Sequence, residues 1–255
     1  MHLRLFLLIV AVTLVACADV GDRDNPTDPV APSYAQSLHY GEYYDPGTKS
    51  SVKSKIAWNY MNPAVAYGEV LDGRDVRIYR TAYINDRVWL AENVNYDGSG
   101  LCYENDSTLC AKYGRLYTYK EASTVCPQGF HLPTKEEWNL LPDASALLAS
   151  KGWQLDNGDM GGSNSSGFTV LPGGRYVSVK SSSVDTGYAD IAHAAYMWTA
   201  TKASNDSAYS VLFSSVPERW LGLSPRSDRF YVRCVRESSA TIVPVTTVDT
   251  TALGG

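Results

Sequence analysis

The five cysteines are the residues whose chemistry the sequence defines best. Cys17 follows a short apolar run at the N-terminus, and Cys102, Cys110, Cys126 and Cys234 lie in the body of the chain. A thiol directly behind a leader segment can be acylated, whereas thiols inside an exported domain usually pair as disulfides. The positions of the cysteines therefore bear on both the compartment and the fold.

Residues 1–16 are expected to be a lipoprotein signal peptide. The apolar run Leu5–Ala16 follows one positive charge, and its twelve residues are too few for a membrane-spanning helix, which needs roughly 20. Leu14-Val15-Ala16-Cys17 has the form of a lipobox, so Cys17 is the predicted lipidation site and its lipid the predicted membrane anchor. Ala18, rather than Asp, follows this cysteine, which favours the outer membrane or the cell surface. The alternative is a plain secretory signal that happens to contain a cysteine.

The four remaining cysteines form an even set, which in an exported protein predicts two disulfides with three possible pairings. Cys102 and Cys110 flank a polar turn, and their pairing would leave Cys126 with Cys234. The chain-entropy model assigns about 4.7 kcal/mol to the long loop and roughly 2.5 kcal/mol to the short one. A zinc site is the competing interpretation, but no Cys-x-x-Cys pair occurs and the four histidines are scattered.

Other chemistry has little support in the sequence. No Gly-x-Ser-x-Gly motif accompanies His193, and His131 fits a structural role on a short strand. Asp156-Asn157-Gly158-Asp159 offers oxygen ligands for calcium, but an Asx-rich turn is the simpler interpretation. Removing residues 1–16 takes away Arg4 and no acidic residue, so the net charge changes from −5 to −6. This acidic balance argues against a nucleic-acid partner, and no catalytic group, metal or cofactor is expected.

The residues between the two ends of the chain predict a compact α+β pattern. A polar tether is expected over 17–67 and a Thr/Val-rich tail over 238–255. Helical spacing predicts a helix over 119–125, and a capping box of Thr134 and Glu137 begins a second helix that reaches Leu148. Gly, Ser and Asn from 152 to 187 predict long loops with short strands. Alternating apolar residues predict strands at 76–84, 88–91, 130–132, 197–200, 209–213 and 230–236.

Six sequence blocks resemble one family. They are residues 88–96, 110–118, 126–138 (with Leu132-Pro133-Thr134-Lys135-Glu136-Glu137-Trp138), 171–175, 198–201 and 232–235. Over residues 68–237 their order and spacing are similar to the Fibrobacter succinogenes major paralogous domain, a family of exported bacterial domains of largely unknown function. The resemblance implies a C-type lectin-like fold, stapled by disulfides, with two helices, short antiparallel sheets and long irregular loops. It also implies a bridge from the end of the first helix to the last strand, here Cys126 to Cys234.

The same resemblance allows two specific activities to be weighed. Calcium-dependent sugar binding in lectins uses Glu-Pro-Asn or Gln-Pro-Asp with Trp-Asn-Asp, and Trp198-Thr199-Ala200 lacks the acidic ligand. The sulfatase-modifying domain, a more remote relative, needs reactive cysteines to generate formylglycine, whereas the cysteines here are better used as structural bridges. Glu92 and Asn93, inside the first block, are expected to bond loop backbone.

We therefore expect a surface-tethered, non-enzymatic lipoprotein that binds a ligand or mediates adhesion. Its recognition surface should lie within the 152–228 loops, where aromatic rings could stack on sugars and an arginine could bind a carboxylate. The candidate ligand residues are Tyr188, Tyr196, Trp220 and Arg226. A polysaccharide or an envelope protein is the expected partner. A structural or assembly protein of the envelope is the second hypothesis, and an enzyme related to the sulfatase-modifying factor is the third.

Overall fold

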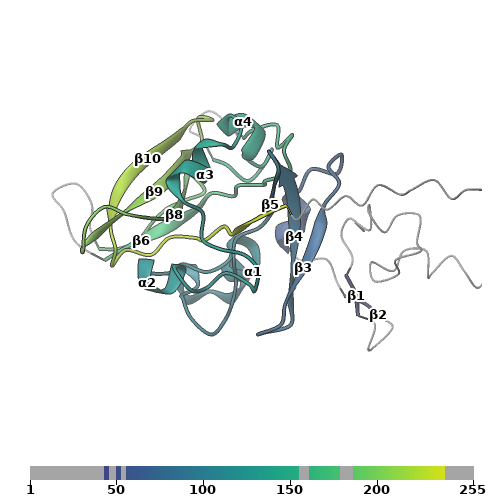
Figure 1. The fold of residues 1–255 in the computed structure, drawn as a ribbon, viewed down its shortest axis with the longest axis horizontal. Coiled ribbons are helices and arrows are strands. Elements are labelled where there is room, and N and C mark those ends of the chain that lie inside the picture. The colour runs from purple at the N-terminus through teal and green to yellow at the C-terminus, as the bar shows by residue number, and fades with distance from the viewer. Residues whose placement is uncertain (1–42, 46–49, 53–55, 155–160, 179–185, 239–255) are drawn as a thin grey trace, which may run out of the picture.

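A computed structural model describes residues 43–45, 50–52, 56–154, 161–178 and 186–238. The described residues fold mainly into two curled β-sheets with short helices around them (Figure 1). A separate two-stranded ribbon pairs β1 (Tyr43–Asp45) with β2 (Ser50–Val52). The predicted lipidation site Cys17, the Asp156–Asp159 segment and the tail beyond residue 238 lie outside the described residues.

The first sheet has four antiparallel strands in the order β11-β5-β4-β3. Their bounds are β3 Gly68–Asp72, β4 Arg77–Ile84, β5 Arg87–Leu90 and β11 Val235–Glu237. β4 and β5 confirm the predicted hairpin, and their turn places Asn85 and Asp86 at φ 49° and 61°. Positive φ at both turn residues matches the right-handed twist of the two strands. The last strand of the chain therefore pairs with an early hairpin.

The second sheet has five strands in the order β10-β9-β8-β6-β7. Their bounds are β6 Gly173–Val177, β7 Gly187–Ile191, β8 Ala194–Lys202, β9 Ser207–Ser214 and β10 Arg219–Pro225. β6 and β8 are parallel and pair only at Gly174 and Ala195. Beyond that point residues 229–231 enter between them and bridge to both strands. β6 and β7 therefore lie in and just beyond the 152–187 segment, where we predicted long loops with short strands.

The helices are short and lie around and between the sheets. Their bounds are η3 Ile56–Tyr60, η4 Tyr103–Asn105, α1 Ser107–Tyr113, α2 Tyr119–Ala122, α3 Lys135–Asn139 and α4 Ala144–Leu147. α3 packs against β8 and β9. Thr134 and Glu137 make the predicted capping box, but the helix they begin ends within two turns and Pro142 separates it from α4. The helix predicted over 119–125 is a single turn, after which Cys126 leaves to join Cys234.

The prediction of an α+β, C-type lectin-like fold is therefore wrong. The longest helix in the described part of the chain has seven residues, and the sheets carry the architecture. Apolar residues at helical spacing were too few to require more than one turn each, and the Gly-rich segment supplied strands instead. The two disulfides are present: Cys102–Cys110 clips η4 to α1, and Cys126–Cys234 joins the end of α2 to the residue before β11.

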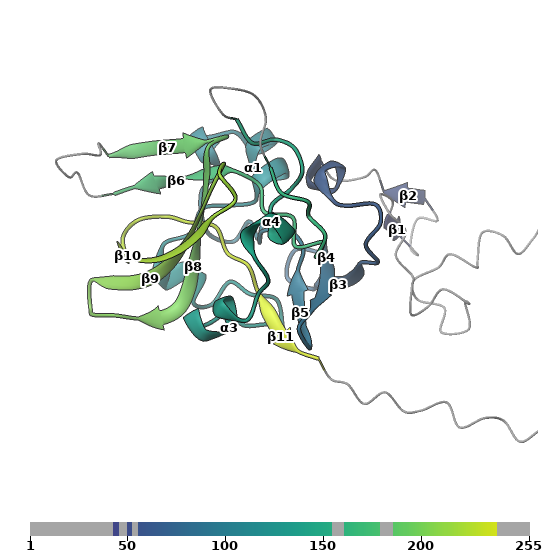
Figure 2. The same cartoon turned by 90° about the horizontal axis from the view of Figure 1, so that it is seen from above.

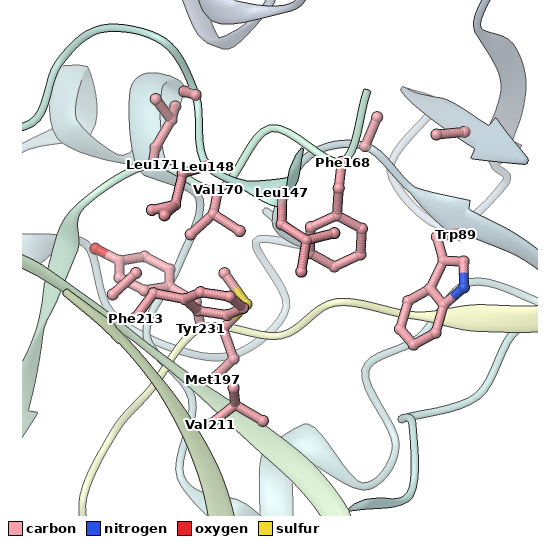
Figure 3. Close-up of a cluster of buried hydrophobic side chains, with 14 of the residues drawn as sticks. Trp89, Leu147, Leu148, Phe168, Val170, Leu171, Met197, Val211, Phe213 and Tyr231 are labelled. Atoms are coloured by element: carbon pink, nitrogen blue, oxygen red, sulfur yellow. The ribbon is translucent and has the colours of Figure 1, made fainter. Parts of the chain in front are cut away.

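Aromatic and aliphatic side chains from both sheets and from the segments between them form the core (Figure 3), and Figure 2 shows the two sheets on either side of it. The rings of Trp89 and Trp138 lie 5.6 Å apart, and both contact Phe168, at 5.5 and 5.8 Å between ring centres. Trp58 and Tyr67 are also buried, so the packed structure begins before residue 68, where the predicted tether ended. These contacts pack the two sheets against each other. β10 lies at the outside of the second sheet (Figure 1).

Candidate ligand-binding surface on the second sheet

The strand register brings two of the four predicted ligand residues into one row. Tyr196 on β8 lies opposite Leu212 on β9, and Leu212 lies opposite Trp220 on β10. Residues directly opposite each other in neighbouring strands point to the same face of a sheet. Tyr196 and Trp220 are two strand spacings apart, which is roughly 10 Å. We call Tyr196, Leu212 and Trp220 the aromatic row.

A polar cluster borders the aromatic row at Tyr196. The Tyr196 hydroxyl donates to Asp190 Oδ2 at 2.9 Å, and Arg175 Nε lies 2.8 Å from the same oxygen. The Arg175 guanidinium also lies over the Tyr196 ring, 4.4 Å from its centre. Burial, followed by the Asp190 charge, raises the pKa of Tyr196, so its hydroxyl stays protonated and keeps donating. Asp190 has φ 66°, a left-handed conformation that side chains rarely adopt inside a strand.

Tyr188 belongs to the opposite face of the sheet. It lies opposite Tyr176 on β6, one position out of phase with Arg175, and its ring contacts Tyr176 and Tyr103 at 5.0 and 4.8 Å. Its hydroxyl donates to the Cys102 carbonyl at 3.3 Å. Tyr188 therefore packs β7 against the disulfide-clipped η4 and is not part of the aromatic row.

Arg226 is held at the other end of β10. Its Nη1 donates to the Asn205 carbonyl at 2.6 Å, and its guanidinium lies 4.8 Å from the centre of the Tyr119 ring. It lines an open depression of about 570 Å³ together with residues 205–207 and 223–227. Since one guanidinium nitrogen bonds the β8–β9 turn and the guanidinium lies over the Tyr119 ring, Arg226 does not converge with Trp220 on one ligand.

Sequence analysis missed the most exposed apolar residues of this sheet. Besides the predicted Trp220 (43% exposed), Leu221 and Leu223 on β10 are 36% and 60% exposed, and Val216 in the β9–β10 turn is 49% exposed. β10 is the outermost strand, and no other described segment pairs with its open side. A run of Trp, Leu and Leu predicts burial by composition, so only the topology reveals that this strand is an exposed edge.

The hydrogen-bond phase of β10 shows which backbone groups are open. Alternate residues of an antiparallel pair turn their N–H and C=O groups toward the neighbouring strand. The Arg226 N–H donates to the Asp206 carbonyl, and the register continues without a shift to Arg219. Trp220, at an even position like Arg226, faces β9 with its backbone, so Leu221 and Leu223 direct their N–H and C=O groups to the open edge. Pro225, which has no N–H, sits in the same outward phase.

Potential catalytic or metal-binding groups are engaged in structural contacts. His131 Nε2 lies 2.9 Å from Glu137 Oε1, while Glu137 Oε2 accepts the Thr134 N–H at the start of α3. Cys102, Cys110, Cys126 and Cys234 are all disulfide-bonded. The described part of the chain contains no cluster of three His, Cys, Asp or Glu side chains that could hold a metal ion.

A smaller cavity of about 220 Å³ lies between η3, β4, residues 92–95 and α1. Glu92 in its wall accepts from Trp58 Nε1 and from the Arg80 N–H, both at 2.9 Å. Asn93 donates to the Tyr113 carbonyl and accepts from Arg233 Nε, at 2.7 Å each. Glu92 and Asn93 were predicted to bond loop backbone; they instead bond the backbone of β4 and α1 and two buried side chains.

Arg233 is the centre of that buried network. Its guanidinium also donates to the carbonyls of Leu90, Phe168 and Thr169 and lies 4.5 Å from the centre of the Phe168 ring. Burial lowers the pKa of Arg233 to about 9, so it remains charged at neutral pH. One cation thus joins β5, the 168–169 turn and the strand that leads to β11. The sequence blocks at 88–96 and 232–235 meet here.

The fold and surface define a small, disulfide-bonded, mostly β domain with a partly apolar outer strand. Residues 83–236 match the model of the Fibrobacter succinogenes major domain, and since this is more than half of the chain, the protein belongs to that family. No curated protein and no solved structure matches the chain. Among the described residues, no helix is both long and apolar enough to cross a membrane.

Proposed function

We propose that this protein is a non-enzymatic binding module of the cell envelope, tethered by a lipid on Cys17, whose β10 accepts an extended segment of a partner protein. The observation that supports this proposal is the open edge of β10. There, the outward backbone groups of Leu221 and Leu223 coincide with exposed apolar side chains. A sheet edge of this kind is a ready template for another strand.

Both the backbone groups and the side chains of the β10 edge would contribute to recognition. The outward N–H and C=O groups of β10 would hydrogen-bond a partner strand regardless of its sequence. Trp220 on one face, with Leu221 and Leu223 on the other, would select apolar side chains at alternate positions of that strand. Natural edge strands are usually protected by charges or by a covering segment. In β10 the single charged residue, Arg219, is instead turned to the carbonyls of Leu141 and Pro142.

A blocked peptide of alternating Thr and Val, as long as β10, provides a direct test. In the mature chain, binding should slow the amide hydrogen exchange of Leu221 and Leu223. Leu223→Pro removes one outward N–H in the phase that Pro225 already occupies, so the sheet should survive while binding is lost. Leu223→Ala keeps the N–H and should bind more weakly than wild type but better than Leu223→Pro. Leu71→Ala, which truncates a leucine of similar exposure (54%) on β3, is the matched control. Unchanged exchange, or equal binding by Leu223→Pro, would contradict the proposal.

The aromatic row favours a carbohydrate as a second candidate ligand. The exposed Trp220 indole could stack on a sugar ring, with the Arg175–Asp190 pair near enough to Tyr196 to bond hydroxyl groups. Retention on immobilised polysaccharides separates the two candidates. Trp220→Ala should abolish sugar binding and Leu223→Pro should leave it intact. Tyr83→Ala, which removes an exposed aromatic ring from the first sheet, is the control.

A further inference from the structure

We infer that the occupant of the β10 edge is the C-terminal segment of a second copy of this chain, residues 240–248. This inference rests on the proposed function and names its partner. The segment reads Ala-Thr-Ile-Val-Pro-Val-Thr-Thr-Val and carries no charge. Thr, Val and Ile favour extended structure because their branched side chains pack well on a pleated surface. Only Ser238 and Ser239 separate this segment from the end of β11.

The donor segment matches the acceptor in length and in hydrogen-bond phase. Within the donor, residues 242–248 are enough to cover the seven residues of β10. Pro244 cannot donate, so it must face away from β10, as prolines at sheet edges do. The backbones of Val243 and Val245 then face β10 and meet the outward groups of Leu221 and Leu223. The alternation leaves Ile242 and Val248 in the same outward phase as Pro244.

The geometry points to a second copy rather than to the same chain. β11 pairs with β5 in the first sheet, whereas β10 is the outer strand of the second sheet, on the other side of the domain (Figures 1 and 2). From Ser238 to Ile242 the chain spans at most about 14 Å. A seven-residue strand alone is about 23 Å long. With so short a linker, the apolar residues of the tail cannot extend from β11 along their own β10 on the other side of the domain, so the occupant that we infer is the tail of a second copy.

Such an interface joins two different surfaces, the tail of one copy and the edge of the next. When each copy binds the next, rather than two copies exchanging tails reciprocally, contacts of this kind continue from copy to copy and form rings or open chains. Copies anchored on one membrane would be held at high local concentration, which favours the contact. The inferred assembly is therefore a head-to-tail array at the surface of the envelope.

Proline substitutions test the inference from both sides. Leu223→Pro blocks the acceptor edge and Val245→Pro blocks the donor, and each should weaken self-association of the mature full chain by about tenfold or more, as expected for a lost hydrogen bond and its neighbours. Thr246→Pro faces away from β10 in the donor and should associate like wild type. Leu223→Ala keeps the acceptor N–H and should associate better than Leu223→Pro. Light scattering after size-exclusion chromatography gives the masses.

Mixing the two blocked variants is the decisive measurement. Val245→Pro retains its acceptor edge and Leu223→Pro retains its donor tail, so together they should form a one-to-one complex that cannot grow. Slowed exchange at Leu221 and Leu223 must accompany this complex. The inference is overturned if wild type stays monomeric at high concentration, if Thr246→Pro is as defective as Val245→Pro, or if the mixture does not pair. If the Thr/Val peptide still protects the β10 amides in these cases, only the identity of the partner is wrong. If the peptide also fails, the proposed function falls with it.

Discussion

The two disulfides should differ sharply in how much they stabilise the domain. Cys126 and Cys234 are 108 residues apart, whereas Cys102 and Cys110 are 8 apart. A disulfide stabilises mainly by restricting the unfolded chain, and the restriction grows with the length of the closed loop. The variants to compare are Cys126→Ala/Cys234→Ala and Cys102→Ala/Cys110→Ala, each with the other bridge intact.

The expected losses follow from the loop lengths. The chain-entropy relation gives about 4.8 kcal/mol for the long bridge and about 2.5 kcal/mol for the short one. With a urea m-value of about 2.5 kcal/mol/M, the unfolding midpoints should fall by about 1.9 M and 1.0 M. Cys234 is fully buried, so its truncation adds a small cavity loss in the same direction. The loops do not overlap, so complete reduction of the wild type should cost about the sum, about 7.3 kcal/mol.

Urea unfolding followed by tryptophan fluorescence measures these losses, because Trp89, Trp138 and Trp198 are fully buried. Reduced wild type is the control for the cavity, since it keeps every sulfur atom. The reasoning would be refuted if the short bridge cost as much as the long one. It would also be refuted if the reduced wild type lost much less than the two variants together.

Three further predictions concern buried polar groups and backbone geometry. Arg233→Met should cost about 3–5 kcal/mol in urea unfolding, because it leaves the Asn93 side chain and three backbone carbonyls without their donor; Arg233→Lys, with a single compact ammonium, should recover only part of this loss. Burial alone would raise the pKa of Glu121, but the Thr118 hydrogen bonds and Arg229 lower it below the unfolded value of 4.5. Ionised Glu121 therefore stabilises the fold above pH 4.5, and this stabilisation is lost as the pH falls through the lower, folded pKa. Glu121→Gln should therefore cost about 1 kcal/mol at pH 7 and progressively less below pH 4.5 in a urea–pH series, and a constant difference at all pH values would contradict the assignment. Gly174→Ala should lower the melting temperature, because Gly174 has φ 73° and an added Cβ would lie 2.3 Å from the Ala189 carbonyl oxygen. A variant with an unchanged melting temperature and unchanged near-UV circular dichroism would contradict this prediction and show that β6 and β7 can separate there.

Local patterns in the sequence predicted local structure well. The alternation over 76–91 produced the β4–β5 hairpin, the strands around Trp198 and Val211 are present, and Thr134 caps α3 as expected. A second capping box, Thr118 with Glu121, has the same spacing and was overlooked. These features depend on residues within one hairpin or one turn, which is the range over which sequence periodicity is informative.

The fold class could not be inferred in the same way. β6 and β7 contain Gly173, Gly174 and Gly187, which weaken any strand pattern, and they become strands because they pair with residues far along the chain. Residues 230–236 read as one strand, but 229–231 bridge β6, β8 and Tyr117 before β11 begins. Such pairings are tertiary, so β propensity alone does not reveal them.

The candidate surface was only partly predictable for a related reason. Tyr196 and Trp220, which we predicted in a loop region, lie on β8 and β10, and their alignment depends on the register of β8, β9 and β10. Tyr188 and Arg226 were predicted from residue type in the same way, but each is engaged in a structural hydrogen bond instead. The exposure of Leu221 and Leu223 follows from β10 being the last strand of its sheet, a property of topology rather than of residue type.

Residues 229–231 lie between β6 and β8, so the second sheet can be completed only after these late residues are available. A chain that emerges from its N-terminus, from a ribosome or through a translocation channel, cannot close its second sheet until nearly its whole length is free. Cys126 likewise waits for Cys234, so oxidation of that pair can seal the domain only at the end. Folding dominated by such distant pairings is slow. Until its last residues are free, the polypeptide therefore lacks both the completed second sheet and the long disulfide.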